Sequence, residues 1–145
     1  IRDSLEGYDK TKRNRTVNRK KWDQDQLNKL LDDQETLPAQ IFSWYSRTLR
    51  MRAGCPAFHP EAPQEILDFG SDIFALRRVS IDGGLSVFCL FNFTAKDSKV
   101  PEMNLLGTHF PQGKARDLIS GGEIDWCKKS VLSLRPFQAL WLSTS

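Results

Sequence analysis

Residues 85–94, LSVFCLFNFT, are apolar on both sides of an alternating pattern. In an extended chain one side holds Leu85, Val87, Cys89, Phe91 and Phe93, and the other holds Phe88 and Leu90 between Ser86 and Asn92. A strand that is apolar on both sides at its centre is typical of a strand buried in a β-sandwich. This stretch therefore predicts an all-β domain that contains it as a buried strand.

Short strand-like segments separated by turns continue on both sides of this stretch, from about Glu65 onward. Asp82-Gly83, followed by Gly84, predicts a hairpin that leads into the buried strand. Together the sequence predicts seven strands: Glu65–Phe69, Ile73–Ser80, Leu85–Thr94, Val100–Leu105, Ala115–Ser120, Ser130–Leu134 and Pro136–Leu142. That number is expected for a small antiparallel β-sandwich.

Two helices are predicted before the strands. Asp23 caps a short one whose apolar edge is Leu27, Leu30 and Leu31. A longer helix at about 39–53 has Pro38 in its first turn and ends at Gly54. Its apolar side chains recur at steps of three and four residues: Ile41, Phe42, Tyr45 and Leu49, widened by Trp44 and Met51. So broad an apolar face predicts packing against a large surface, part of which we expect from a domain outside this chain.

The first 22 residues are polar and charged, and we expect an extended loop there. Between Lys10 and Lys21 the chain has seven basic residues and no acidic one, although the net charge of the whole chain is only +3. This basic segment could be a solvated arm, a nucleic-acid contact or a set of ligands for an anionic or hydroxyl-rich molecule. Only Tyr8 and Trp22 flank it, and it contains no aromatic residue that could stack on bases. The pattern alone favours a solvated arm and argues against a nucleic-acid partner.

The sequence predicts no self-contained active site, no metal site and no cofactor. His59 and His109 are far apart and resemble ordinary loop histidines. Cys55, Cys89 and Cys127 fit neither a complete disulfide set nor a zinc pattern, so we expect buried, reduced thiols in a cytoplasmic protein. No run of about 18 apolar residues predicts a membrane span.

One segment of the basic arm changes this interpretation. Arg15-Thr16-Val17-Asn18-Arg19 closely resembles the Arg-Asp-Ile-Asn-Arg motif that follows the eighth barrel strand in sugar phosphorylases of glycoside hydrolase family 13. The resemblance continues in order along the chain, through Leu49–Arg52, Pro56–Pro60, Phe74–Arg78, Asp117–Gly121 and Leu134–Leu142. The chain is therefore similar to the C-terminal piece of a sucrose-phosphorylase-like or glucosylglycerate-phosphorylase-like enzyme.

This resemblance implies an α+β fragment with two parts. Residues 1–57 would be the end of a (β/α)₈ barrel, namely its last loop and two helices, and residues 58–145 would be the antiparallel all-β domain. It also implies that Arg15 binds the glucosyl ring in the donor subsite. For Asn18 and Arg19 we expect a role in supporting the loop in preference to direct ligand binding. The whole enzyme would transfer glucose from sucrose or a related α-glucoside to phosphate, giving glucose 1-phosphate. The acceptor stays open between fructose, fructose 6-phosphate, glycerate and similar molecules.

The chain itself is expected to be inactive, because the catalytic carboxylates implied by the resemblance come from earlier barrel strands. Its expected partners are the sugar substrate, phosphate and the missing barrel portion of the same polypeptide. Two alternatives remain. A free-standing carbohydrate-binding sandwich would need a surface platform of aromatic residues, whereas most Phe and Trp here are expected on buried faces. A nucleic-acid-binding module would use the basic arm.

Overall fold

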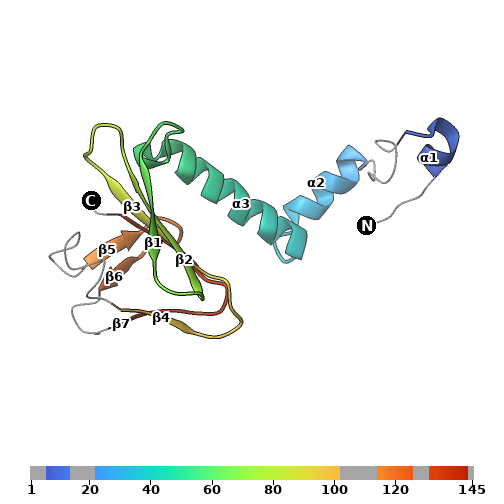
Figure 1. The fold of residues 1–145 in the computed structure, drawn as a ribbon. Coiled ribbons are helices and arrows are strands. Elements are labelled where there is room, and N and C mark those ends of the chain that lie inside the picture. The colour runs from blue at the N-terminus through green and yellow to red at the C-terminus, as the bar shows by residue number, and fades with distance from the viewer. Residues whose placement is uncertain (1–5, 14–21, 102–113, 126–130, 144–145) are drawn as a thin grey trace. The chain divides into compact units, whose positions relative to one another are not determined.

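The structure, a computed structural model, describes residues 6–13, 22–101, 114–125 and 131–143 (Figure 1). The chain divides into two compact units, residues 1–46 and 47–145. The boundary between the units falls inside the long helix α3 (Leu37–Gly54), whose last turns are grouped with the strands. The predicted division of the parent enzyme after residue 57 stays a prediction.

The first unit contains α1 (Glu6–Thr11), α2 (Gln24–Asp32) and the beginning of α3. Helix α1 shows that the expectation of an extended loop over residues 1–22 is wrong for these six positions. Contacts between near neighbours lie at its C-terminal end: the Lys12 amide donates to the Tyr8 carbonyl, and Lys12 Nζ lies 3.7 Å from Asp9 Oδ1. These contacts use backbone and charged groups, so the sequence of the helix has no apolar period. The pattern therefore did not predict it.

The two predicted helices are confirmed as α2 and α3. Asp23 is the N-cap of α2, and its Oδ1 accepts hydrogen bonds from the amides of Asp25 and Gln26, both at 3.1 Å. Thr36 precedes α3 and links the two helices, because its Oγ1 donates to the Leu30 carbonyl at 2.8 Å and accepts from the Ala39 amide at 3.3 Å. These side-chain contacts set where each helix begins.

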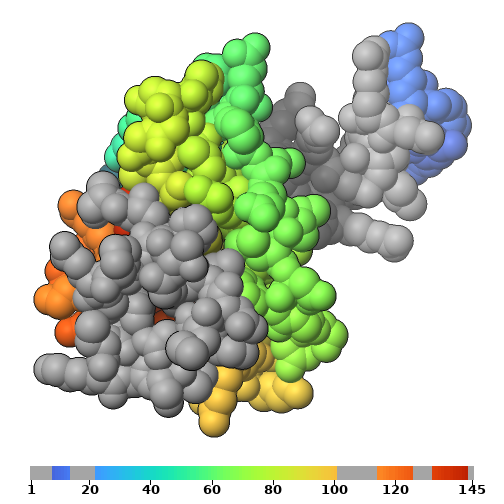
Figure 2. Space-filling view, turned by 60° about the vertical axis from the view of Figure 1, so that its left-hand side comes forward, coloured from blue at the N-terminus to red at the C-terminus, as the bar shows by residue number. Residues whose placement is uncertain are grey.

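In its described residues the second unit contains a 3₁₀ turn, η2 (Pro56–Phe58), and eight strands. The strands are β1 (Gln64–Asp68), β2 (Ile73–Val79), β3 (Ser86–Asn92), β4 (Ser98–Pro101), β5 (Lys114–Asp117), β6 (Glu123–Asp125), β7 (Val131–Leu134) and β8 (Ala139–Ser143). Every pairing is antiparallel; one sheet has the order β1-β2-β3-β8-β5-β6, and the other is the pair β4-β7. Figure 2 shows this unit from another side, with the green residues of β1 and β2 along one border.

The main core lies between these two sheets. The small sheet contributes Val100, Leu132 and Leu134, and the large sheet contributes Ile73, Ala75, Phe88, Leu90, Ala115, Leu140 and Leu142. All ten side chains are buried, so the antiparallel sandwich is held together by apolar side chains from both sheets. The all-β part of the predicted fold is confirmed, and the assignment of the helices to the end of a barrel stays a prediction.

Each of the seven predicted strands overlaps a strand of the structure. The stretch LSVFCLFNFT contains β3, which pairs with β2 on one side and β8 on the other. The three-residue strand β6 was not predicted, because so short a segment has no detectable alternation. The last strand begins at Ala139 rather than Pro136, since Phe137 has a φ of 55° and forms part of a turn.

The predicted hairpin at Asp82-Gly83 is confirmed. Gly83 has a φ of 74°, which a residue without Cβ adopts at little cost. The Asp82 carboxylate accepts hydrogen bonds from the Ser80 hydroxyl and from the Gly84 amide. These bonds favour the ionised form and hold the pKa of Asp82 below its usual value.

Candidate functional site

The three residues predicted to bind ligand or support the site, Arg15, Asn18 and Arg19, lie outside the described residues. The described neighbours before them, Asp9–Arg13, are exposed. The roles of the three residues therefore stay predictions.

Within the described parts of the chain, no group of three or more His, Cys, Asp and Glu residues could hold a metal ion. The exposed His59 accepts a hydrogen bond on Nδ1 from the Glu61 amide at 3.2 Å, so it shapes the turn before β1. His109 and Cys127 lie outside the described residues. Cys55 and Cys89 are free thiols; Cys89 is buried, and burial raises its pKa to about 12. None of the helices in the described ranges could cross a membrane.

A broad apolar surface runs along α3 and is exposed. It comprises Leu37, Ile41, Phe42, Trp44, Tyr45 and Leu49, and is called the α3 face below. Every one of these side chains has at least 45% of its area exposed, and Ala39 is the only buried residue that the helix contributes. The apolar face predicted for the long helix is therefore present. A surface of this kind marks a contact with another apolar surface.

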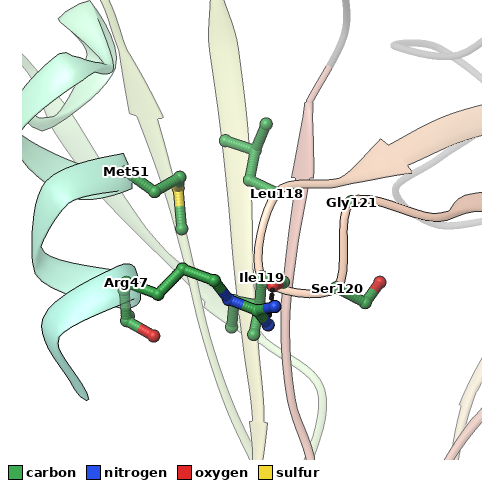
Figure 3. Close-up of a pocket in the computed structure, with 7 residues that line it drawn as sticks. Arg47, Met51, Leu118, Ile119, Ser120 and Gly121 are labelled. Carbon is green, nitrogen blue, oxygen red and sulfur yellow. Dashed lines mark hydrogen bonds between the residues drawn. The ribbon is translucent and has the colours of Figure 1, made fainter. Parts of the chain in front are cut away.

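A second feature is an open pocket of about 210 Å³ where the last turns of α3 meet the turn after β5 (Figure 3). It is lined by Arg47, Thr48, Met51, Leu118, Ile119, Ser120 and Gly121. Arg47 points from the helix toward the turn, and its Nη2 donates to the Ile119 carbonyl at 2.9 Å (Figure 3). The guanidinium thus fastens the turn to the helix.

The carboxylate of Asp117, which is 3% exposed, fixes this turn from inside. Its oxygens accept hydrogen bonds from the amides of Ile119 at 3.2 Å, Ser120 at 3.1 Å and Trp141 at 3.0 Å. The segment Asp117–Gly121, part of the family resemblance, therefore shapes the fold. Sequence reasoning did not assign Asp117 a role, although an Asp two residues before an amide it can cap is a known turn signal.

Arg78 plays a similar part for the segment that leads into β1. Its Nε donates to the Ala57 carbonyl at 2.8 Å, and its Nη2 donates to the His59 carbonyl at 2.8 Å. Its guanidinium lies 6.0 Å from the centre of the Phe58 ring. In this way one side chain of β2 holds residues 57–59 against the large sheet.

A third feature is a group of apolar side chains on one side of the large sheet and just after β3, called the aromatic face below: Ile66, Phe74 and Phe93, which are exposed, and Phe91, which is half-buried. The three ring centres lie 6.1–6.4 Å apart. Ile66, Phe74 and Phe93 are 74%, 43% and 68% exposed. The expectation that most Phe and Trp lie on buried faces is wrong for Phe74 and Phe93, and on the α3 face for Phe42 and Trp44. The pattern shows which side chains share a face, but it does not show whether anything covers that face.

No model of a known protein family matches the sequence. Curated relatives do: glucosylglycerate phosphorylase of Escherichia coli (strain K12) is 28% identical over 141 residues, which is 97% of this chain and 23% of the relative. The enzyme of the same name from Allomeiothermus silvanus is 32% identical over 136 residues, 94% of this chain and 21% of the relative. A third, from Spirochaeta thermophila, is 39% identical over 87 residues, 60% of this chain and 15% of the relative.

Solved structures share the fold. An Anoxybacillus α-amylase superimposes with a TM-score of 0.57 and 20% identity, covering 72% of this chain and 22% of the amylase. The trehalulose synthase MutB of Pseudomonas mesoacidophila superimposes with a TM-score of 0.55 and 19% identity, covering 80% of this chain and 19% of the synthase. The predicted resemblance to sugar phosphorylases of glycoside hydrolase family 13 is confirmed. The chain spans only 15–23% of the length of the curated relatives it matches.

Proposed function

We propose that this chain is part of a retaining glucosyl phosphorylase of glycoside hydrolase family 13. The whole enzyme transfers glucose from glucosylglycerate, sucrose or a related α-glucoside to phosphate and releases glucose 1-phosphate. The observation that carries this proposal is that a curated glucosylglycerate phosphorylase aligns with 97% of the chain. The buried, reduced Cys89 agrees with the cytoplasmic location we assign to it.

The proposed reaction follows the two-step logic of retaining glycosidases. A carboxylate attacks the anomeric carbon while an acid protonates the departing glycosidic oxygen, so a covalent glucosyl-enzyme forms. A phosphate oxygen then attacks the same carbon, and the bond to the enzyme breaks with overall retention of configuration. Both carboxylates belong to the part of the enzyme outside this chain. The chain alone is therefore expected to release no glucose 1-phosphate.

Within this enzyme we assign Arg15 to the donor subsite. A guanidinium offers several N–H donors in a fixed plane, which suits hydroxyl groups of a bound glucosyl ring. Asn18 and Arg19 would support the loop that carries Arg15. This assignment rests on the match of Arg15-Thr16-Val17-Asn18-Arg19 to the family motif.

The remaining barrel of the same polypeptide is the proposed partner of the α3 face. Its six large apolar side chains are at least 45% exposed, which is unusual for contiguous apolar positions on a helix of a complete domain. Packing this face against other barrel elements would remove their apolar area from water and stabilise both parts.

The proposal is tested on the longer polypeptide encoded by the gene that contains this chain. With phosphate and glucosylglycerate, or with phosphate and sucrose, it should release glucose 1-phosphate, measured by a coupled dehydrogenase assay. If no α-glucoside gives glucose 1-phosphate, the proposed function is wrong.

The role of Arg15 is tested in the same polypeptide. Loss of its charge-assisted hydrogen bonds in Arg15→Ala should lower kcat/KM for phosphorolysis by roughly 100-fold, because such bonds contribute about 1.5–3 kcal/mol. Arg13→Ala is the matched control, since it removes an exposed arginine two positions away and should change kcat/KM by less than about twofold. Equal effects of the two substitutions would contradict a donor-subsite role for Arg15.

A further inference from the structure

Two free thiols lie in one apolar cluster. Cys89 belongs to β3 and is buried, whereas Cys55 directly precedes η2 and is half-buried. Cys55 packs against the cluster that Ala57, Phe58, Val87 and Cys89 form. A buried thiol and a thiol that reaches solvent therefore share the same neighbours.

The register of the large sheet shows why the two cysteines come together. Cys89 is opposite Trp141, and residues that stand opposite each other point to the same side of a sheet. Phe58 covers this side, since its ring centre lies 4.6 Å from that of Trp141. The Phe58 amide donates to the Cys55 carbonyl at 3.0 Å, so one tight turn holds Cys55 over the side to which Cys89 points.

The surroundings of Cys55 place it beside the part of β3 that contains Cys89. Cys55 lines an open pocket of about 440 Å³, together with residues that include Leu85 and Ser143. Ser143 is opposite Val87, which precedes Cys89 by two positions and shares its side of β3. Same-side neighbours in a strand are about 6.6 Å apart, and a disulfide joins Cα atoms up to about 6.8 Å apart. A small movement of the turn before η2 is therefore enough to bring Cys55 to Cys89.

The electrostatics of Cys89 agree with this proximity. Burial raises its pKa to about 12, the positive charge of Arg78 acts in the opposite direction, and repulsion from a charged Cys55 raises it further. Such repulsion acts only between groups that lie near each other. Arg78 also supplies a positive charge that favours the thiolate of Cys89 when the proton leaves.

Access differs between the two thiols and sets the order in which they react. Cys55 opens into the pocket of about 440 Å³ and into a second open pocket of about 350 Å³, while Cys89 is 2% exposed. Because the thiolate is the nucleophile, the buried Cys89 reacts poorly with a reagent in solution. It can still attack a sulfur atom that is held beside it.

We propose that Cys55 and Cys89 form a redox-active pair, which a small disulfide such as oxidised glutathione converts into an intramolecular disulfide. The Cys55 thiolate attacks one sulfur of oxidised glutathione, the bond between its sulfurs breaks, and one glutathione leaves as a thiolate. The Cys89 thiolate then attacks the Cys55 sulfur of the mixed disulfide, and the second glutathione leaves. The two protein thiols thus lose two electrons and two protons, which the two released glutathione molecules carry.

Peptide mapping of the folded longer polypeptide after oxidation tests the proposal. Trypsin leaves Cys55 and Cys89 in two separate peptides, residues 53–77 and 79–96. After treatment with oxidised glutathione and alkylation of the remaining thiols, the two peptides should be joined in at least about half of the molecules, and dithiothreitol should separate them. Unfolding in concentrated urea before oxidation should lower the yield of this link at least about fivefold, because the fold no longer holds the thiols together.

Three substitutions complete the test. Cys127→Ser is the matched control, since it removes the third cysteine of the chain and should leave the link between residues 53–77 and 79–96 intact. Cys55→Ala should abolish the link and leave Cys89 unmodified, and Cys89→Ala should stop the reaction at the mixed disulfide of Cys55 with glutathione.

The proposal is overturned if the folded, unsubstituted polypeptide keeps glutathione on Cys55, joins either cysteine to Cys127 or does not react. An equal yield of the link in concentrated urea would overturn it as well. None of these readouts uses phosphorolysis, so the test does not depend on the proposed function.

Discussion

Asn92 shows how one buried polar side chain holds the β unit together. It is 2% exposed, and its Nδ2 donates to the carbonyls of Lys96 at 2.8 Å and Arg135 at 2.9 Å. Its Oδ1 accepts from the amide and the hydroxyl of Thr94 at 2.9 and 2.8 Å. One amide therefore ties the end of β3 to the turn before β4 and to the residue after β7.

Asn92→Ala should lower the free energy of unfolding by about 3 kcal/mol, because buried carbonyls and an amide lose their partners together. Urea denaturation of the 145-residue chain measures this loss. Asn28→Ala is the control: Asn28 is exposed on α2 and accepts one bond from Gln24, so its replacement should cost less than about 0.5 kcal/mol. Similar losses for the two variants would contradict a structural role for Asn92.

Cys89 gives the fold a dependence on alkaline pH. Burial disfavours the thiolate and raises the pKa of Cys89 from 9.0 to about 12 in the folded chain. Below the unfolded-state pKa both states hold the proton, so this group changes nothing there. Between about pH 9 and about pH 12 only the unfolded state releases it, and the free energy of unfolding should fall by roughly 1.4 kcal/mol per pH unit from this thiol.

Cys89→Ala removes this contribution. We expect the free energy of unfolding of the parent chain to fall more steeply between pH 9 and pH 11 than that of the variant, as measured by urea denaturation at several pH values. Cys55→Ala keeps Cys89 and should retain the steep decline. Parallel curves for the parent chain and Cys89→Ala would show that the thiol ionises equally in both states.

At the level of single elements, local sequence signals were enough wherever a helix or strand is determined by its own residues. The two-sided apolar pattern of LSVFCLFNFT predicted β3 because both of its faces are buried against other parts of the unit. Asp23 predicted the start of α2 because its carboxylate caps that helix directly. Helix α1 and strand β6 escaped prediction because neither has an apolar period.

Contacts between elements could not be predicted from the same signals. Arg78 was placed correctly on a strand, but its bonds to the carbonyls of Ala57 and His59 depend on how the chain folds back onto β2. The same holds for Arg47, which reaches the Ile119 carbonyl 72 positions along the chain. The candidate site residues Arg15, Asn18 and Arg19 came from family resemblance alone, because a basic run by itself is typical of a solvated arm.

At the scale of the whole molecule, two groups of exposed apolar side chains stand out among the described residues. The α3 face and the aromatic face together expose nine large apolar side chains: Leu37, Ile41, Phe42, Trp44, Tyr45, Leu49, Ile66, Phe74 and Phe93. Most apolar surface that a folded protein leaves in such patches takes part in a contact. If the rest of the longer enzyme normally covers the α3 face, the 145-residue chain without it should associate with itself through that face.

Ile41→Glu/Tyr45→Lys tests this expectation. It places two charges on the α3 face, four positions apart, where the order Glu before Lys also supports the helix. The 145-residue chain should associate in a concentration-dependent way in sedimentation velocity experiments. The variant should weaken that association at least about tenfold, since burying a charge in an apolar contact costs more than about 1.4 kcal/mol. Far-UV circular dichroism should be unchanged, because both side chains are 56% exposed. Gln40→Glu/Ser43→Lys adds the same charges at exposed polar positions of α3 and should leave the association intact; equal weakening by both variants would show that net charge, rather than the α3 face, controls it.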